Sequence, residues 1–321
     1  MAGIVVFIRS MHALGDQLVG YPLLYQLHQQ YPNHRVTVVA HDPVGNYYTQ
    51  LPWVHQFVHA TMAAQKYRSI AKDTEIIIAL HHSSELYSLL GAIKRIPVRL
   101  GFKNKRATDF LWTHRLPKDI NQYIGLANLQ LLGQLHPFDT GQAARHSMAW
   151  LASQKNTPVE HTDVVFMVGG GAGAFKRWGI ANYTALAQRL QHHLGPNTTF
   201  TCILGPAETS ELAQLQQINT PHLRLMVSRP LAEIADLCLN AKLIVANDCG
   251  PSHIAQNTGT PYVGLFNEPN PEWFWQRPNT RAVTPPQGTI DIQSVSIECV
   301  EAACCNALKN ISNESKTAMV A

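Results

Sequence analysis

The chain has 321 residues, of which 45% are apolar and 14% charged, and its formal net charge at pH 7 is +4. At roughly 150 residues per domain, this length predicts two domains. The balance of apolar and charged residues excludes a disordered chain and a coiled coil. The longest apolar runs, such as 76–80, fall far short of the ~20 residues that cross a bilayer.

The first apolar run, 4–8, is followed directly by Arg9. It therefore predicts a strand and not a signal peptide, and we expect a cytoplasmic protein. Six cysteines include no CxxC pair. We expect buried thiols and not a metal or disulfide site.

Short apolar runs alternate with amphipathic segments in the first half of the chain. Strands are predicted at 4–8, 36–40 and 75–80, and helices at 17–31 and from Ser84 onward. Such alternation favours a parallel sheet with helices on both faces.

The polar stretch 150–162 contains Pro158 and has no clear period. It predicts a linker between domains at 1–155 and 162–321. After it the alternation resumes, so the sequence predicts an α/β protein with two Rossmann-like halves that face each other across a hinge. Residues 311–321 are expected to be frayed. The predicted strands are 163–168, 199–204, 223–227, 243–246 and 261–265, and the predicted helices are 180–194, 208–217, one from Pro230, and 296–309.

A glycine-rich segment, 169–173, follows the strand predicted at 163–168. It matches neither GxGxxG nor GxxxxGK[ST], which disfavours a dinucleotide fold and a P-loop enzyme. A small-residue turn at the carboxyl end of a strand is where open α/β sheets bind ligands. Lys176 and Arg177 follow and suit an anionic group, although two solvated surface cations are the alternative. Trp178 is expected in the core.

Segment 10–18 follows the first predicted strand and contains Gly15 and Asp16. Gly15 permits a tight turn, and Asp16 is expected at the first turn of the helix that begins near Gln17. A carboxylate that faces the crevice between the domains suits a general base. The alternative is that Asp16 is an N-cap, which is a common role of Asp.

Segment 247–255 follows another predicted strand. Gly250 and Pro251 are expected to open a helix, with Pro at a favourable position. The free backbone N–H groups of Gly250, Ser252 and His253 then form a phosphate site. His253 can add a hydrogen bond to a phosphate oxygen, although for this residue alone a buried structural histidine is the simpler interpretation.

Basic residues are concentrated in the first half of the chain. Residues 1–160 carry 15 Lys and Arg against 9 Asp and Glu, whereas the rest carries 10 against 12. This excess favours an anionic partner. Between Lys94 and Lys118 there are eight basic residues and one acid, Asp109. A second basic group consists of Lys66, Arg68 and Lys72.

From about Ile4 to Leu308 the sequence resembles glycosyltransferase family 9, the ADP-heptose:lipopolysaccharide heptosyltransferases. FKRWGIANYTALAQRL is similar to the family's KxWP…W/F-xxLAxxL stretch. NDCGPSHIAQNTGTPYVGLF is similar to [ND]D[TS]GPxHxAAAxGTPxVxLF, and NEPNPEWFWQRP to GPTDPxxWxP. SMHALGDQL resembles S-x-[IM]GD, with extra residues between Ser10 and Gly15.

The chain departs from the family pattern at two positions. Gly179 stands where the family has Pro after KxW. Cys249 stands where the family has Thr or Ser, which removes a hydroxyl that could bond a phosphate or a ribose.

The resemblance implies a GT-B fold, with parallel sheets facing across a cleft. It also implies an inverting, metal-independent transfer of a sugar from a nucleoside diphosphate to an acceptor hydroxyl, without a cofactor. No DxD motif is present. Asp16 is implied as the general base, and Lys176 as the cation that offsets charge on the departing diphosphate.

The implied donor is a nucleotide sugar, ADP-heptose, bound by the C-terminal domain. Glu208 and Glu211 are alternative candidates to bind the ribose hydroxyls. At least one of them is expected to be a solvated helix charge. The residues expected to bind the donor are Arg177, Glu208, Glu211, Asp248, Gly250, Pro251, Ser252 and His253.

The implied acceptor is phosphorylated lipid A bearing Kdo, a polyanion at the cytoplasmic face of the inner membrane. We therefore expect peripheral attachment there. A basic face with Phe102, Phe110 and Trp112 nearby suits this anionic lipid-linked glycan. A merely solvated face is the alternative, and no motif indicates nucleic-acid binding. The residues expected to bind the acceptor are Lys66, Arg68, Lys103, Lys105 and Arg106.

Three other functions stay open. The chain could use another nucleoside diphosphate sugar for a different surface glycan, which Cys249 leaves possible. It could be a nucleotide-sugar epimerase, because such enzymes share the GT-B architecture. It could also be a binding protein without catalysis, but Asp16 and Lys176 argue against this because a binder needs neither a base nor a leaving-group cation.

Overall fold

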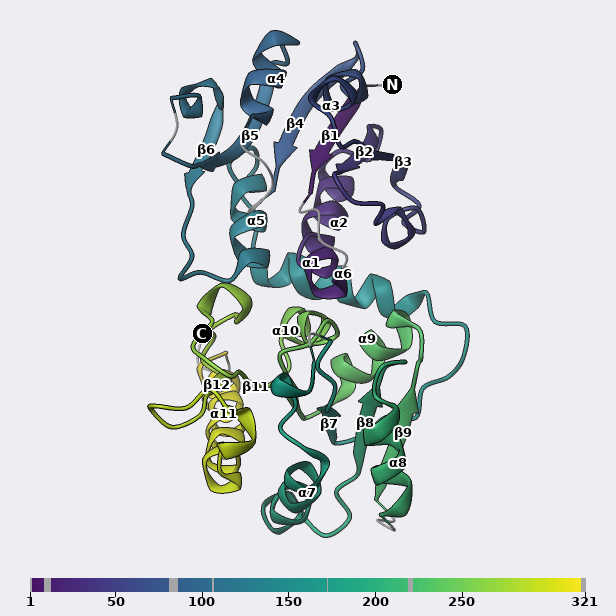
Figure 1. Cartoon of the computed structure of the whole chain (residues 1–321), viewed down its shortest axis with the longest axis vertical. Coiled ribbons are helices and arrows are strands. Elements are labelled where there is room, and N and C mark those ends of the chain that lie inside the picture. Colours follow the sequence, from purple (N-terminus) through teal and green to yellow (C-terminus); the bar gives the residue numbers. More distant parts are fainter. Residues whose placement is uncertain are drawn as a thin grey trace. The chain divides into compact units, whose positions relative to one another are not determined.

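The computed structural model describes residues 2–8, 13–80, 86–105, 107–171, 173–218 and 222–318. The chain divides into two compact units, Met1–Ser147 and Met148–Ala321. Each unit contains one six-stranded sheet (Figure 1). In the described ranges, no helix is both long and apolar enough to cross a membrane.

The sheet of the N-terminal unit has the strand order β3-β2-β1-β4-β5-β6, and all neighbouring strands are parallel. The order reverses between β1 and β4. The strands are β1 (Gly3–Phe7), β2 (Arg35–Ala40), β3 (Val54–His59), β4 (Thr74–Ala79), β5 (Val98–Lys103) and β6 (His114–Pro117). The helices are α1 (Leu14–Leu18), α2 (Tyr21–Gln30), α3 (Ala63–Ser69), α4 (Tyr87–Ile93) and α5 (Ile124–Leu132), with the 3₁₀ turns η1 (Gly45–Tyr47) and η2 (Asp109–Leu111).

The predicted strands 4–8, 36–40 and 75–80 are confirmed as β1, β2 and β4, each shifted by at most about one residue. The helix predicted at 17–31 is instead two helices, because Gly20 separates α1 from α2 and Pro22 lies in the first turn of α2. Strands β3, β5 and β6 were not predicted. They contain exposed or half-buried residues, so they lack the continuous apolar run of a buried strand.

The sheet of the C-terminal unit has the order β12-β11-β10-β7-β8-β9 and is also parallel throughout. The strands are β7 (Val164–Met167), β8 (Phe200–Leu204), β9 (Leu223–Val227), β10 (Leu243–Asn247), β11 (Tyr262–Leu265) and β12 (Thr280–Val283). The helices are α7 (Ile180–Leu194), α8 (Thr209–Gln217), α9 (Leu231–Asn240), α10 (Ser252–Thr258) and α11 (Ile297–Ala318), with the 3₁₀ turns η3 (Ala174–Lys176), η4 (Pro271–Trp273) and η5 (Ile292–Ser294).

The elements of this unit follow the prediction closely, and helix 180–194 and strand 223–227 are confirmed residue for residue. Two expectations are wrong. Helix α6 (Thr140–Ser153) occupies the start of the predicted linker, so irregular chain begins at Gln154. Helix α11 continues to Ala318 instead of ending at residue 309, since no Gly or Pro interrupts it.

The core of this unit lies on both faces of its sheet. Every residue of β7, β8, β10 and β11 is buried, as expected for a parallel sheet. Trp178 is fully buried, and its indole N–H donates to the carbonyl of Val295 at 2.8 Å, which confirms its core role. All six cysteines are free thiols, but only Cys202, Cys238 and Cys304 are buried as expected. Cys249 and Cys305 are half-buried, and the expectation is wrong for Cys299, which is exposed.

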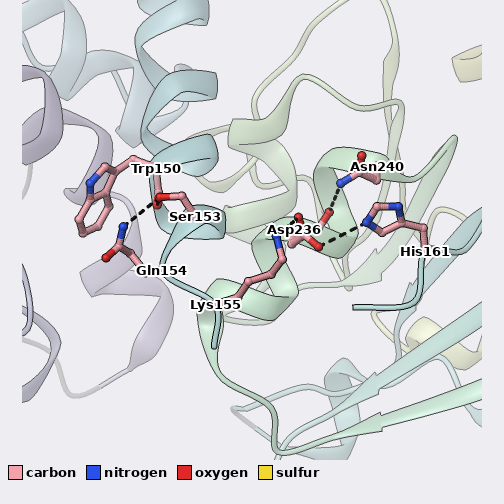
Figure 2. A network of polar contacts seen from close by, with 7 residues as sticks. All are labelled: Trp150, Ser153, Gln154, Lys155, His161, Asp236 and Asn240. Carbon is pink, nitrogen blue, oxygen red and sulfur yellow. Dashed lines mark hydrogen bonds and ion pairs between the residues drawn. The ribbon is translucent and has the colours of Figure 1, made fainter. Parts of the chain in front are cut away.

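The chain that follows α6 is fastened to helix α9 (Figure 2). Lys155 Nζ donates to Asp236 Oδ1 at 2.9 Å, and His161 Nε2 lies 3.3 Å from Asp236 Oδ2. Between them, the Thr157 hydroxyl donates to Glu233 at 2.8 Å. The segment is therefore held to the C-terminal unit at both ends, although its sequence has no regular period.

Candidate active site

The loops after β7, β8 and β10 meet at the carboxyl edge of the C-terminal sheet. Strand β7 is the first of this unit, and its neighbours in the sheet are β8 on one side and β10 on the other. The strand order therefore reverses between β7 and β10. Open α/β sheets bind ligands at this edge, beside such a reversal.

Lys176 and Asp248 form an ion pair at this edge. Lys176 ends η3 in the loop after β7, and Asp248 directly follows β10. The Lys176 ammonium donates to Asp248 Oδ2, although the two residues are 72 positions apart in the sequence. The fold thus brings the predicted catalytic cation, Lys176, into contact with Asp248, which is predicted to bind the nucleotide-sugar donor.

Arg177 binds the two acids of the loop and helix that follow β8. Its Nη1 donates to Glu211 Oε1 at 2.8 Å, and its Nη2 lies 3.7 Å from Glu208 Oε1. Both glutamates are buried, so the expectation that one of them is a solvated helix charge is wrong. Burial raises the pKa of Glu211, but hydrogen bonds from Ser210 and Arg177 outweigh it and hold that pKa below its ordinary value.

Two glycines make room for Glu208. A Cβ at Gly169 would lie 2.7 Å from the Glu208 carboxyl carbon, and one at Gly205 would lie 2.8 Å from Glu208 Oε2. The Gly205 N–H donates to that oxygen at 2.7 Å. The glycine-rich turn after β7 therefore permits a close approach between loops, which side chains would prevent.

Asn247, the last residue of β10, connects the elements around the site. Its Oδ1 accepts hydrogen bonds from the Tyr183 hydroxyl at 3.0 Å and the Trp178 N–H at 3.4 Å. Its Nδ2 donates to the Val168 carbonyl at 2.8 Å. This fully buried side chain holds β10 to the end of β7 and to the start of α7. No role was predicted for Asn247 from the sequence, although its place directly before Asp248 was a usable signal.

The start of α10 differs from the expected phosphate site. The N–H groups of Ser252 and His253 donate to the carbonyls of Cys249 and Gly250, each at 3.2 Å. These two groups are therefore not free, because a tight turn at residues 249–252 leads directly into the helix. The Ser252 hydroxyl also donates to the Cys249 carbonyl, at 2.7 Å.

His253 is buried beside Trp273, with the ring centroids 5.4 Å apart. Burial lowers the pKa of His253 to about 4, so its ring is neutral at pH 7. It can exchange hydrogen bonds with a ligand but adds no positive charge. In the described part of the chain, no group of three or more His, Cys, Asp and Glu residues could hold a metal ion.

Asp16 lies in α1, which follows β1 of the N-terminal sheet. The N-cap of α1 is Ala13, so the alternative that Asp16 is itself the N-cap is wrong. Its side chain is 8% exposed and lies in the first turn, where the helix dipole favours a carboxylate. Burial, together with the negative charge of Asp16, raises the pKa of Tyr48. Ser10 of the same motif lies outside the described residues.

The residues predicted to bind the acceptor lie in separate places in the N-terminal unit. Lys103 ends β5 and is in register with Pro117 of β6. Lys105 and Lys118 therefore leave the same carboxyl edge of the sheet, and all three lysines are exposed. Arg106 lies outside the described residues.

Arg68 lies at the opposite edge. It lines a hollow of about 440 Å³ together with Gly3, Arg35 and Thr74, which begin strands β1, β2 and β4. Because all strands are parallel, these residues mark the amino edge. Lys66 precedes Arg68 by two residues in α3, and its ammonium is 5.5 Å from the ring centroid of Tyr87.

Other predicted members of the basic face stabilise local structure. Lys94 Nζ donates to the Ile70 carbonyl at 2.9 Å, and Arg99 Nε donates to the Leu111 carbonyl at 2.7 Å. The aromatic residues expected on that face are also divided, since Phe102 and Trp112 are buried in the core and Phe110 is exposed. The expectation that Phe102 and Trp112 stand on the basic face is therefore wrong.

Solved structures of similar architecture define the fold class of this chain. The E. coli ADP-heptose LPS heptosyltransferase II is 18% identical with a TM-score of 0.60, over 97% of this chain and 100% of that chain. The E. coli heptosyltransferase WaaC with ADP is 14% identical with a TM-score of 0.64, over 94% and 98%. Together with the two parallel sheets, these likenesses define the fold as that of a GT-B glycosyltransferase.

The family follows from the sequence. The model of glycosyltransferase family 9 (heptosyltransferase) matches residues 71–303. Lipooligosaccharide heptosyltransferase 2 of Haemophilus influenzae is 23% identical over 285 residues, covering 81% of this chain and 82% of that protein. The chain belongs to glycosyltransferase family 9, which confirms the resemblance, and it is a glycosyltransferase.

Proposed function

We propose that this protein is an inverting, metal-independent heptosyltransferase. It moves heptose from ADP-heptose to an inner-core acceptor of lipopolysaccharide at the cytoplasmic face of the inner membrane, and it uses no cofactor. Family membership supports the reaction class. The observation that carries the assignment is the Lys176–Asp248 pair at the carboxyl edge, beside the reversal of strand order.

Lys176 offsets negative charge on the departing diphosphate. An ammonium has three N–H donors, so Lys176 can keep its bond to Asp248 and still donate to phosphate oxygens. The ion pair fixes the position of the cation before the donor arrives. A preorganised donor of this type contributes roughly 3–4 kcal/mol to transition-state stabilisation. With Arg177 nearby, this site has no need of a divalent cation.

Glu208 is the better candidate for the ribose hydroxyls. Both carboxylate oxygens of Glu211 are engaged, one by Arg177 and the other by the Ser210 hydroxyl at 2.7 Å. The Glu208 Oε2 atom accepts a hydrogen bond from the Gly205 N–H. Among the described residues, the Glu208 Oε1 atom has only the 3.7 Å approach of Arg177. A carboxylate oxygen with spare acceptor capacity suits a pair of vicinal hydroxyls.

Asp16 acts as the general base. It accepts the proton of the acceptor hydroxyl while that oxygen attacks the anomeric carbon from the side opposite the diphosphate. The bond from the anomeric carbon to the phosphate oxygen breaks as the new glycosidic bond forms, so the configuration inverts. Such a base accelerates a reaction by about 10²–10⁴-fold.

The test is a reaction of the purified protein with ADP-heptose and a Kdo–lipid A acceptor. Mass spectrometry should detect an acceptor extended by one heptose, and NMR should show the inverted anomeric configuration. A control with donor alone should leave the donor sugar unchanged. An isomerised sugar in that control, without transfer, would make the protein an epimerase and overturn the proposal.

Cys249 favours a second candidate, a transferase that uses a different nucleoside diphosphate sugar. Burial raises the pKa of Cys249 to about 12, so it is a protonated thiol and a weaker hydrogen-bonding group than the family's hydroxyl. A panel of ADP-, GDP- and UDP-sugars in thermal shift distinguishes the two. Stabilisation by a GDP- or UDP-sugar, and not by ADP-heptose, supports the second candidate.

A further inference from the structure

Exposed apolar side chains gather on one part of the N-terminal unit. Of eleven large apolar residues that are exposed in the described part of the chain, six belong to α3, α4 and η2 or directly precede one of the two helices, and they are 38–72% exposed. We name this set the apolar face. It consists of Met62, Tyr67, Leu86, Leu89, Ile93 and Phe110.

Helix α4 has an apolar stripe on the side away from the core. Leu86, Leu89 and Ile93 are spaced by three and four residues, so they lie on one side of the helix. Tyr87 and Gly91 are buried on the other side. A helix that is apolar on both sides is usually buried, yet α4 keeps one apolar side exposed.

Helix α3 lies beside α4 and extends this surface (Figure 1). Lys94, which follows α4, places its ammonium 3.9 Å from the ring centroid of Tyr67 and donates to the Ile70 carbonyl. Lys66 of α3 in turn lies over the Tyr87 ring. Helix α3 has no buried residue, so Met62 and Tyr67 stand on the same outer surface as the α4 stripe.

The turn η2 continues the apolar face on the other side of α4. It packs against α4, and the Ser88 hydroxyl donates to the Thr108 carbonyl at 3.2 Å. Phe110, in the middle of η2, is the most exposed large apolar residue of the described chain. Isolated apolar residues on a surface are normal, but neighbouring ones from three elements indicate an interaction site.

Cations outnumber acids in and beside the segments that carry the apolar face. The segments Ala63–Ser69 and Tyr87–Ile93 contain no Asp or Glu. The acid of η2, Asp109, accepts a hydrogen bond from the backbone of Asn104 at 2.9 Å. The basic residues of the two helices and of the turn after α4 are Lys66, Arg68, Lys94 and Arg95.

We propose that the apolar face and the cations beside it dock this protein on a bilayer that contains anionic lipids. Apolar side chains enter the boundary between headgroups and acyl chains, while Lys and Arg are attracted to the anionic headgroups. Charge complementarity therefore selects an anionic lipid surface as the occupant. The inference rests on the proposed function in one respect, that the acceptor is linked to lipid.

Vesicle sedimentation tests the docking surface without any measurement of transfer. The protein should sediment with phosphatidylcholine vesicles that contain phosphatidylglycerol and much less with phosphatidylcholine alone, and added salt should weaken the binding. The double variant Leu89→Glu, Ile93→Glu should lower the fraction bound on the order of tenfold. The matched control is Ile120→Glu with Ile290→Glu, because these residues are 62% and 69% exposed and lie outside the apolar face. It carries the same change of charge and should bind like the parent protein.

Three results would overturn the inference: no binding of the parent protein to the anionic vesicles, undiminished binding of the double variant, or a dimeric parent that becomes monomeric in the double variant. The last result would make the face a contact between two copies. Unchanged circular dichroism and unchanged transfer to a soluble, deacylated acceptor show that the double variant is folded. If no donor supports transfer but vesicle binding follows the expected pattern, the proposed function fails and the docking surface stands.

Discussion

The two units share a strand topology but arrange their charged residues differently. At the carboxyl edge of the C-terminal sheet, cations are paired with acids from other loops, as in Lys176 with Asp248 and Arg177 with Glu211. At the carboxyl edge of the N-terminal sheet, Lys103 and Lys105 are exposed. The same architecture therefore carries a fixed network in one unit and solvated cations in the other.

This difference fits the two kinds of ligand that we propose. A nucleotide sugar is small, and its phosphates and hydroxyls need partners at fixed positions, which pairing provides before binding. A phosphorylated lipid presents distributed charge to a broad surface, and solvated cations attract it over a distance of about a Debye length. Variants of each unit should therefore affect different kinetic constants.

The largest effect is expected at Asp16. Replacing it by Asn should lower turnover about 10²–10⁴-fold, because the acceptor hydroxyl loses its base. The affinity for the nucleotide-sugar donor, measured by calorimetry, should be nearly unchanged, since the residues proposed to bind the donor belong to the other unit. Asp119→Asn, at an exposed position of the same unit, is the control. An equal loss of donor affinity in Asp16→Asn would make Asp16 a structural residue.

Lys176→Ala should lower turnover about 100-fold, with a smaller effect on donor binding. If Asp248 acts by holding the lysine, the double variant with Asp248→Asn should be little worse than Lys176→Ala alone. Steady-state kinetics of the two single variants and the double variant provide the test. Full additivity would show that the ion pair has no part in catalysis.

Arg177→Ala should affect stability more than turnover, and its effect on turnover should be milder than that of Lys176→Ala. It leaves Glu208 and Glu211 buried without their cation, which should reduce the free energy of unfolding by about 3 kcal/mol. The folded pKa of Glu211 is lowered from 4.5, so its pairing stabilises the fold above that pH and is lost as pH falls. The difference between parent and variant in urea unfolding should therefore narrow below pH 4.5. If the difference in unfolding free energy between parent and variant does not change with pH, the Arg177–Glu211 ion pair does not stabilise the fold in this way.

A smaller effect is expected from the exposed cations. Lys103→Glu with Lys105→Glu should raise the acceptor KM several-fold, because each exposed cation contributes only about 1 kcal/mol at an anionic surface. Donor KM should be unchanged. The control with equal charge change is Lys72→Glu with Arg145→Glu, also at exposed positions of this unit. The same rise in both variants would show a general effect of charge instead of a local acceptor site.

No effect is expected from EDTA. If Lys176 and Arg177 provide the positive charge for the diphosphate, activity after chelation should equal activity with added Mg²⁺. If EDTA abolishes transfer and added Mg²⁺ restores it, the metal-independent mechanism is wrong. The ion pairs of Lys176 and Arg177 then do not have the role proposed for them.

The sequence by itself determined the α/β class, most of the C-terminal elements and the family. Buried strands such as β7 and β10 are continuous apolar runs, and α7 has a regular amphipathic period between Gly179 and Gly195. These signals are local, so they can be recognised in the sequence without knowledge of the fold. The edge strand β3 was missed because its exposed residues interrupt that pattern.

Only the tertiary structure decided which charged residues meet. Lys176 reaches Asp248 because β10 lies next to β7 in the sheet, although β8 and β9 come between them in the sequence. The burial of Glu208 depends in the same way on the approach of the loop at Gly169. Likewise, Arg68 and Lys103 fall on opposite edges of the N-terminal sheet. The order of the strands, and the sheet edge at which a residue lies, are set by packing between distant segments. Neither composition nor periodicity encodes them.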